Sequence, residues 1–315
     1  MNEFELIEKY FTRPPGRAIL GVGDDAALFS SGKTIAASTD MLVEGIHFLE
    51  NEDPYLLGKK SLSVNLSDMA AMGANPKWAM LALCLPEADE NWLQSFSKGF
   101  MTQADRFGVE LVGGDTTRGP LVVCVQIMGE VDADSALRRD GAMADDEIWV
   151  SGNLGDAALG LLHLQGKIRL EGEDEAACLS ALRDPVPRVE LGLALSGISK
   201  CAIDISDGFC ADLSHILDRS GVSAVVDFDS LPASRTMAKH LKEPAGEKAM
   251  LSGGDDYELC FTASSEKSDE IVGIGKNLGI RLSKVGRIVE GAGLHVLDEK
   301  GREKRIGERG YAHFR

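Results

Sequence analysis

The stretch DPYLLGKKSLSVNLSDMAAMGANPKWAMLALCLP, residues 53–86, predicts a long helix followed by a buried strand. Asp53 and Pro54 are typical of a helix start, and Gly73 is typical of a helix end. The run PKWAMLALCLP (76–86) is mostly apolar and has the length of a strand. A helix that leads directly into such a strand is a building unit of α/β proteins.

The segments on either side of this stretch continue the alternation. Residues 33–40 (KTIAASTD) predict a strand, and residues 89–108 predict a helix. Residues 109–114 and 120–131 predict two more strands, which flank the sequence GGDTTRG. The first part of the chain therefore predicts its own layer of strands and helices.

A second α/β block follows a polar, charged segment at residues 133–146, which we interpret as a domain junction. We expect an α/β (α+β) protein of two domains, at residues 1–137 and 138–315, with an undetermined strand order. The strands expected in the second block are residues 147–152, 201–206, 223–228, 257–264 and 281–289. The helices expected there begin within residues 154–166, 188–199, 207–221 and 265–279.

The composition excludes several classes of partner. The chain of 315 residues has 33 basic and 50 acidic residues and a net charge of −17, which disfavours nucleic acid and anionic membranes. No apolar run reaches the ~20 residues that a membrane span requires. The N-terminal sequence lacks the pattern of a secretory signal, and the six cysteines form no CxxC pair. We expect reduced thiols and a cytoplasmic location.

Short acidic motifs recur along the chain, and each places Asp beside Gly, Ser or Thr. Carboxylate oxygens of this kind are the ligands that Mg²⁺ prefers, and Mg²⁺ usually accompanies phosphates. An acidic protein that binds a polyanion needs cations between the two, so the pattern indicates phosphoryl transfer. The motifs are GVGDD (Asp24, Asp25), STD (Asp40), NLSD (Asp68), GGDTT (Asp115), DISDG (Asp204, Asp207) and GGDDYE (Asp255, Asp256, Glu258).

Asp68 is the most informative of these residues, because the surrounding helix is apolar. A buried carboxylate without a partner costs several kcal/mol in order of magnitude, so it needs a cation or a polar network. A network with Lys59 or Lys60 is the structural alternative to a metal. Asp40 and Asp115 follow apolar strands, where α/β proteins collect ligands. A turn-forming role explains either Asp residue taken alone. It explains less well why the same arrangement occurs at several strand ends.

Other motifs are weaker. Residues 32–34 (GKT) resemble the end of a P-loop, but Ala27 stands where that motif requires Gly, so we reject it. SGNLGD (151–156) fits a phosphate at a helix start or, more simply, a helix start alone. His47 is compatible with a substrate contact or an ordinary packed side chain. Arg139 fits a phosphate contact and an interdomain charge equally well.

The motifs together resemble the thiamine-monophosphate kinase family. GVGDDAAL, STDMLVEGIHF, NLSDMAAMGANP, GGDTTRGP, AIDISDG, LSGGDDYELCF and GYAHF follow that family's order over essentially the whole chain. The superfamily also contains aminoimidazole ribonucleotide synthetase and selenophosphate synthetase. GVGDD alone would indicate only the superfamily.

The resemblance implies ATP-dependent phosphorylation of thiamine monophosphate with several Mg²⁺ ions. It also implies a homodimer with paired N-terminal mixed sheets, and a C-terminal α/β domain. The implied metal-holding residues are Asp25, Ser38, Thr39, Asp40, Asp68, Asp115, Asp204 and Asp207. The implied ATP contacts are Gly114, Asp115, Arg139 and Ser206. The implied contacts to thiamine phosphate are His47, Asp255 and Tyr311.

The chain departs from the family's usual residues at two positions, Asp255 and Phe107. Relatives often have Glu at Asp255, and often have Tyr near the nucleotide where this chain has Phe107, which lacks a hydroxyl.

A phosphate monoester is mostly ionised at neutral pH, because its second pKa is about 6, so no catalytic general base is expected. We therefore expect direct in-line transfer without a phosphoenzyme.

Two alternatives remain at this point. The first is another ATP-dependent member of the superfamily, although the first cysteine, Cys84, lies in an apolar strand rather than near the start as selenophosphate synthetases require. The second is a non-catalytic module that binds divalent cations.

Overall fold

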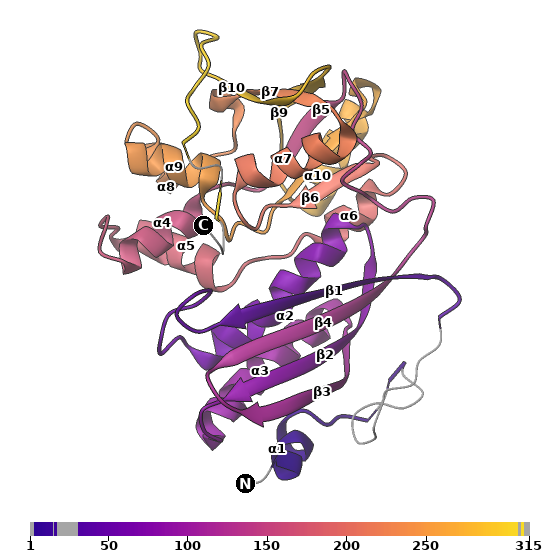
Figure 1. Cartoon of the computed structure of the whole chain (residues 1–315), viewed down its shortest axis with the longest axis vertical. Coiled ribbons are helices and arrows are strands. Elements are labelled where there is room, and N and C mark those ends of the chain that lie inside the picture. The colour runs from indigo at the N-terminus through magenta and orange to yellow at the C-terminus, as the bar shows by residue number, and fades with distance from the viewer. Residues whose placement is uncertain (1–2, 15, 18–30, 308–309, 312–315) are drawn as a thin grey trace. The chain divides into compact units, whose positions relative to one another are not determined.

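The computed structural model describes residues 3–14, 16–17, 31–307 and 310–311, and the chain divides into two compact units (Figure 1). The first unit comprises Met1–Met69 and Ala74–Ala133, and the second comprises Ala70–Gly73 and Asp134–Arg315. Each unit contains one sheet, as the predicted α/β class requires. The boundary predicted after residue 137 falls in the segment that connects the two sheets.

The first unit contains a mixed sheet of four strands in the order β1-β4-β2-β3. Strand β2 pairs with β3 in parallel, and the other pairings are antiparallel. The mixed sheet expected for the N-terminal half is therefore confirmed. Its elements are α1 (Glu3–Tyr10), β1 (Thr34–Val43), α2 (Pro54–Ala71), β2 (Asn75–Leu85), α3 (Glu90–Phe107), β3 (Glu110–Arg118) and β4 (Val122–Val131).

Helices α2 and α3 pack closely together in this unit, because each contributes a glycine to the contact. A Cβ atom built on Gly58 would lie 2.2 Å from the carbonyl oxygen of Phe96. A Cβ atom built on Gly99 would lie 2.0 Å from the carbonyl oxygen of Tyr55. Backbone meets backbone at this point, which no larger residue permits.

The second unit contains a sheet of six strands in the order β10-β7-β9-β5-β8-β6. Only β10 and β7 pair in parallel, and the other neighbours are antiparallel. Its strands are β5 (Glu147–Ser151), β6 (Cys201–Asp204), β7 (Ser223–Asp227), β8 (Leu259–Ala263), β9 (Leu282–Val289) and β10 (Gly293–Leu297). Its α-helices are α4 (Asp156–Leu164), α5 (Gly172–Arg183), α6 (Val189–Leu195), α7 (Phe209–Ser220), α8 (Arg235–His240), α9 (Pro244–Ser252) and α10 (Ser268–Leu278).

Helix α7 shows how the sequence builds the core of this unit. Its buried residues Phe209, Leu213, Ile216 and Leu217 recur at helical spacing and are at most 2% exposed. They belong to one hydrophobic cluster that also contains residues of the sheet. The polar face of α7 remains outside this cluster, so the helix has one orientation on the sheet.

The six cysteines are all free thiols, as expected for reduced cysteines. Cys84 and Cys124 in the first unit are half-buried, whereas the four in the second unit are buried. Burial raises the pKa of Cys178 to about 12 and that of Cys201 to about 11. No helix in the described part of the chain is long and apolar enough to cross a membrane.

Candidate functional site

Strand β1 and helix α2 bring two of the predicted metal-holding residues together in the first unit. The hydroxyl of Ser38 donates a hydrogen bond of 2.6 Å to Oδ2 of Asp68. Alternation along β1 places Ser38, Asp40 and the buried Leu42 on the same face of the strand. The half-buried Asp68 therefore has a specific hydroxyl partner from the strand that also carries Asp40.

Thr39 points away from this pair, since neighbouring residues of a strand face opposite sides. Its hydroxyl donates to the carbonyl oxygen of Val125 at 3.0 Å, which ties it to β4. The predicted metal role of Thr39 thus competes with a backbone bond inside the sheet.

Asp115 lies on the opposite edge of the sheet from Asp40. The register places Asp40 opposite Val125, Val125 opposite Leu81, and Leu81 opposite Gly114, so two strands lie between the two edges. At about 4.8 Å per strand, the two backbones are roughly 14 Å apart. Two Asp side chains on one ion span less than this distance, so this chain alone does not bring both to the same ion.

Gly114 has a structural role in addition to its predicted ATP contact. A Cβ atom there would lie 1.8 Å from the carbonyl oxygen of Leu81, and the residue has a φ of 155°. Close pairing of β3 with β2 therefore requires glycine. Oδ1 of the following Asp115 accepts a hydrogen bond from the Thr116 amide at 2.9 Å.

In the second unit, the loop after β6 and the loop before β8 run side by side. The amide of Asp255 donates to the carbonyl oxygen of Ser206 at 2.9 Å, and the amide of Tyr257 donates to that of Ile205 at 2.8 Å. The amide of Ile205 in turn donates to the carbonyl oxygen of Glu258 at 2.8 Å. The motifs DISDG and GGDDYE, which are about 50 residues apart in the chain, thus form one backbone ladder.

Gly310 and Tyr311 lie against the same loops. The amide of Tyr311 donates to the carbonyl oxygen of Asp207 at 3.0 Å. A Cβ atom on the preceding Gly310 would lie 2.7 Å from that same oxygen, so glycine permits the approach. The structure therefore brings together predicted metal, nucleotide and thiamine-phosphate residues of this unit, which are Asp204, Ser206, Asp207, Asp255 and Tyr311.

Asp212 is a buried carboxyl beside this cluster that the sequence analysis missed. Its Oδ2 accepts hydrogen bonds from the amides of Asp207 and Gly208 at 3.0 and 3.1 Å, at the start of α7. Burial, followed by the charges of Asp204 and Asp207, raises the pKa of Asp212 to about 8. An Asp in the first turn of the helix that follows DISDG was the available signal.

The donor chemistry of both clusters fits Mg²⁺, because carboxylate and hydroxyl oxygens predominate and carboxyls crowd each other. Over the described residues, which leave out Asp25, no three His, Cys, Asp or Glu side chains converge closely enough to hold a metal. The predicted metal set thus falls into a Ser38–Asp68 pair, the separate Asp115, and the cluster at the start of α7.

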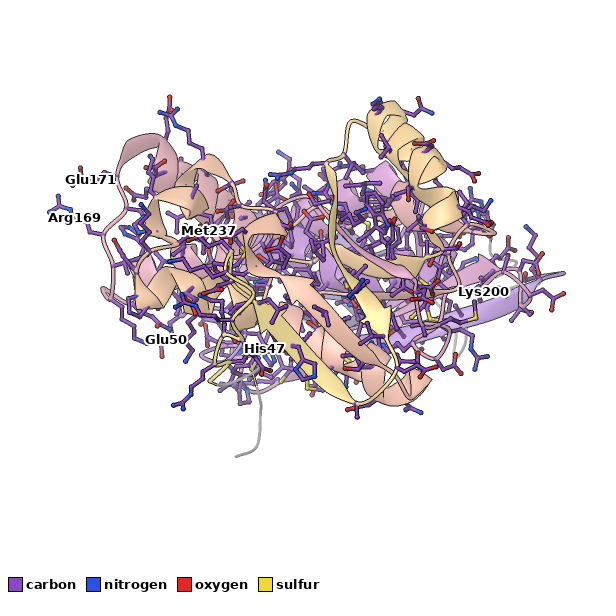
Figure 2. The ribbon with its side chains drawn as sticks, turned by 90° about the horizontal axis from the view of Figure 1, so that it is seen from above. His47, Glu50, Arg169, Glu171, Lys200 and Met237 are labelled. Atoms are coloured by element: carbon purple, nitrogen blue, oxygen red, sulfur yellow. The ribbon has the colours of Figure 1, made fainter. Side chains whose placement is uncertain are left out.

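Two predicted phosphate contacts differ in their surroundings. The amide of Val43 donates to Nδ1 of His47 at 3.0 Å, so the neutral ring carries its proton on Nε2 and can donate from there. Arg139 is exposed, and its carbonyl oxygen accepts from the hydroxyl of Ser220 at 3.0 Å. Figure 2 labels His47. It also labels Arg169 and Glu171, whose exposed side chains form an ion pair of 2.9 Å.

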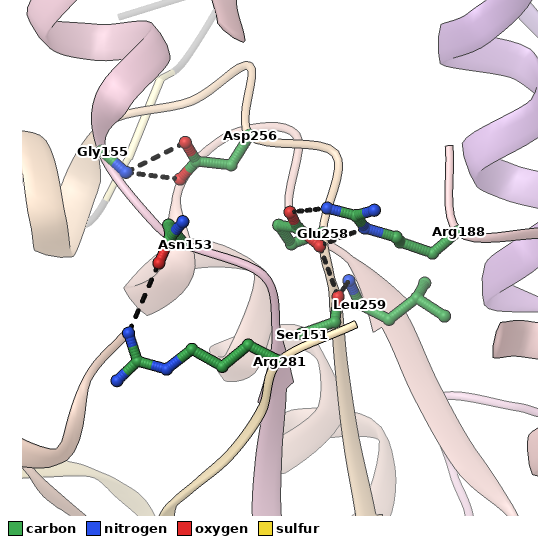
Figure 3. Close-up of polar contacts among 8 residues, drawn as sticks. All are labelled: Ser151, Asn153, Gly155, Arg188, Asp256, Glu258, Leu259 and Arg281. Carbon is green, nitrogen blue, oxygen red and sulfur yellow. Dashed lines mark hydrogen bonds and ion pairs between the residues drawn. The ribbon is translucent and has the colours of Figure 1, made fainter. Parts of the chain in front are cut away.

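A largely buried ion pair between Arg188 and Glu258 holds the end of the GGDDYE loop (Figure 3). Nε of Arg188 donates to Oε2 of Glu258 at 2.6 Å, and the second nitrogen of its fork bonds Oε1. The hydroxyl of Ser151 donates to the same carboxylate at 2.5 Å and accepts from the Leu259 amide at 2.9 Å. Sequence analysis missed this network, because Arg188 and Glu258 are 70 residues apart.

The SGNLGD motif contacts a carboxyl from the protein itself. Both carboxyl oxygens of Asp256 lie close to the amide of Gly155, at 2.9 and 3.1 Å (Figure 3). Asp256 is half-buried, and the loss of water around its carboxyl raises its pKa well above the ordinary value. A Cβ atom on Gly152 would lie 1.8 Å from Oε1 of Glu258. Gly152 therefore leaves space for Glu258, while the amide of Gly155 binds Asp256, which explains the motif without a bound phosphate.

Comparison with known proteins finds one family match in each of the two compact units. Residues 23–131 match the family described as AIR synthase related protein, N-terminal domain. Residues 143–299 match the AIR synthase related protein, C-terminal domain. The two matched domains together show that the chain is one of the AIR synthase related proteins. Within this class the chain belongs to the thiamine-monophosphate kinase family, a family of phosphotransferases, which confirms the resemblance drawn from the motifs.

Relatives cover nearly the full length of the chain. The thiamine-monophosphate kinase of Salmonella typhimurium is 43% identical over 322 residues, which cover 99% of this chain and 98% of the relative. The crystal structure of thiamine-monophosphate kinase from Stenotrophomonas maltophilia K279a is 45% identical with a TM-score of 0.83, covering 89% of this chain and 91% of that one. The structure of AaThiL complexed with AMPPCP and TMP is 32% identical with a TM-score of 0.79, covering 90% and 88%.

Proposed function

We propose that this protein transfers the γ-phosphoryl group of ATP to thiamine monophosphate and so forms thiamine diphosphate. The observation that carries the proposal is identity of 43% to a thiamine-monophosphate kinase over 99% of the chain. Support also comes from the similarity to AaThiL, whose structure holds AMPPCP, an ATP analogue, and TMP. The convergence of Ser206, Asp207, Asp255 and Tyr311 in one unit agrees with a site for two phosphorylated substrates.

The residues that would hold Mg²⁺ are the acidic and hydroxyl groups described above. Mg²⁺, when bound, would neutralise the negative charge of the phosphates at these residues. In the first unit Ser38, Asp40 and Asp68 supply oxygens, and in the second unit Asp204 and Asp207 supply them. Asp25, Thr39 and Asp115 complete the proposed metal-holding set.

The two substrates are assigned to different residues. Gly114, Asp115, Arg139 and Ser206 are the proposed ATP contacts. His47, Asp255 and Tyr311 are the proposed contacts to thiamine monophosphate, and Nε2–H of His47 suits a phosphate oxygen because Nδ1 is already an acceptor.

We propose direct transfer in one step. The attacking group is a phosphate oxygen that is already ionised at neutral pH, since its second pKa is about 6. No side chain has to remove a proton, and the protein contributes positioning and charge neutralisation. The proposed metal-holding side chains that the structure describes carry carboxyl or hydroxyl groups, which agrees with such a role.

A homodimer is the proposed assembly, and the cytoplasm is the proposed location. The first unit exposes Met41, Ile46 and Leu49 on and just after β1, at 55%, 58% and 37%. Large apolar side chains that gather on one exposed segment favour an interface.

The direct test is ADP formation from ATP with and without thiamine monophosphate. We expect ADP and thiamine diphosphate to appear in equal amounts, only when thiamine monophosphate and Mg²⁺ are present. ATP consumption that ignores thiamine monophosphate would contradict the proposal. After incubation with γ-labelled ATP, label that remains bound to denatured protein would contradict the direct transfer step.

A further inference from the structure

The loop that carries Asp255 has an unfavourable backbone. Asp255 and Tyr257 have φ values of 66° and 50°, a left-handed conformation that costs free energy in residues other than glycine. Such residues persist only where their surroundings fix them, and they occur often at ligand sites. The position of Asp255 therefore depends on contacts that hold the loop, residues 253–258, in this form.

One side of the loop is fixed through its backbone. The amides of Asp255 and Tyr257 bond the carbonyl oxygens of Ser206 and Ile205, at 2.9 and 2.8 Å. A Cβ atom on Gly254 would lie 2.3 Å from the same Ser206 oxygen. The strained residues therefore lie directly against the loop that bears the proposed nucleotide contact.

The end of the loop is fixed by a charged fork. The guanidinium of Arg188 donates hydrogen bonds to both carboxylate oxygens of Glu258, and these side chains are 20% and 8% exposed. The hydroxyl of Ser151 bonds the same carboxylate, and Gly152 leaves the space that the carboxylate occupies. Bidentate contacts of this kind fix direction as well as distance.

The fork is anchored outside the loop that it supports. Arg188 immediately precedes α6, whereas Ser151 ends β5. Burial lowers the pKa of Arg188, but the hydrogen bonds and the charge of Glu258 outweigh burial and raise that pKa above its ordinary value. Arg188 therefore stays charged, and the fork links two separate elements to the residue three positions after Asp255.

We propose that Arg188 and Glu258 are positioning residues for the phosphate acceptor. They hold the strained loop against residues 205–206 and thereby set the side chain of Asp255, without themselves binding either substrate. This inference rests on the proposed function, because Asp255 is the proposed contact to thiamine monophosphate. A misplacement of about 1 Å at a substrate contact can cost about 10²-fold in rate, so the support of the loop matters for turnover.

The test compares Arg188→Met, Arg188→Lys and the double variant Arg188→Met/Glu258→Met. We expect KM for thiamine monophosphate to rise about tenfold or more in Arg188→Met and in the double variant, and KM for ATP to change less than threefold. Arg188→Lys keeps the charge without the fork, so its KM should lie between those of wild type and Arg188→Met.

The double variant separates positioning from stability. Arg188→Met alone leaves a buried carboxylate unpaired and lowers the thermal midpoint, whereas removal of both charges restores much of it. We expect KM for thiamine monophosphate to stay raised even so. A double variant with both the midpoint and this KM of wild type would overturn the proposal, because the pair would then act only on stability.

Hydrogen exchange of backbone amides, measured without substrates, tests the positioning role independently of the proposed kinase function. Lys284→Met is the matched control, because Lys284 forms a 3.0 Å ion pair with Glu147 elsewhere in the same unit. The amides of Asp255 and Tyr257 should exchange about tenfold faster in Arg188→Met and in the double variant than in this control. Exchange at the wild-type rate would overturn the positioning role. Absence of ADP formation that depends on thiamine monophosphate in wild type would instead overturn the proposed function.

Discussion

At the scale of single residues, Asp68 combines a structural bond with a proposed ligand. It lies half-buried on α2 and accepts from the hydroxyl of Ser38, so neutralising it should not disturb the helix. The Asn side chain retains an oxygen that can accept this bond but loses the charge that a cation requires. The charge of Asp68 and its shape can therefore be tested separately.

We predict that Asp68→Asn lowers kcat by about 10²-fold or more while the circular dichroism spectrum stays that of wild type. The control is Asp105→Asn in the same unit, where Asp105 pairs with Arg13 at 2.7 Å and is 65% exposed. An exposed pair contributes about 0–1 kcal/mol, so this variant should keep its activity. Near-normal kinetics of Asp68→Asn would speak against its metal role.

A second prediction at this scale concerns pH. The hydrogen bond from Arg302 lowers the pKa of Asp298 to about 2. The pair therefore stabilises the folded state above about pH 4, near the pKa of an unfolded Asp, and this gain is lost as pH falls toward 2. The difference in thermal midpoint between wild type and Arg302→Gln should be constant from pH 7 to 5 and shrink below pH 4. A difference that grows on acidification would contradict the assignment.

At the scale of elements, the crossing of α2 and α3 depends on two glycines. Helix interiors usually gain from Gly→Ala by up to about 1 kcal/mol, because glycine loses more backbone entropy on folding. The crossing reverses this sign, since a methyl group on Gly99 would meet the carbonyl oxygen of Tyr55 at 2.0 Å. Backbone atoms have no rotamer with which to move aside.

We predict that Gly99→Ala destabilises the first unit by about 2 kcal/mol or more, in the range of overpacked cores. The matched control is Gly273→Ala in α10, where an added Cβ meets nothing within 4 Å. Urea unfolding should show a loss for the first variant and a neutral or slightly positive change for the control. Equal midpoints for both variants would mean that the helices separate easily.

At the scale of the whole molecule, sequence pattern predicted the two α/β units, because long apolar strands and amphipathic helices carry a local signal. It assigned no element to β10, α5, α8 or α9, which are short or mixed in composition. The strand order β10-β7-β9-β5-β8-β6 depends on pairings between distant segments, which local pattern does not encode. The DISDG and GGDDYE residues came from motif resemblance, while the Arg188–Glu258 fork had no local signal.

The distribution of thiols over the two units gives a prediction for the folded chain. Burial raises the pKa values of Cys178 and Cys260, and that of Cys178 reaches about 12, so its thiolate fraction near pH 8 is about 10⁻⁴. Only the half-buried Cys84 and Cys124 of the first unit are accessible to a thiol reagent. Native protein should therefore react at no more than two thiols per chain.

All six thiols should react after denaturation in guanidinium. Raising the pH from 7 to 9 should not add a third reactive thiol, because the four thiols of the second unit are closed off by packing. Peptide mapping of the alkylated protein measures this directly. Labelling of Cys178 or Cys260 in the native state at pH 8 would mean that the core of the second unit opens readily, against the packing described above.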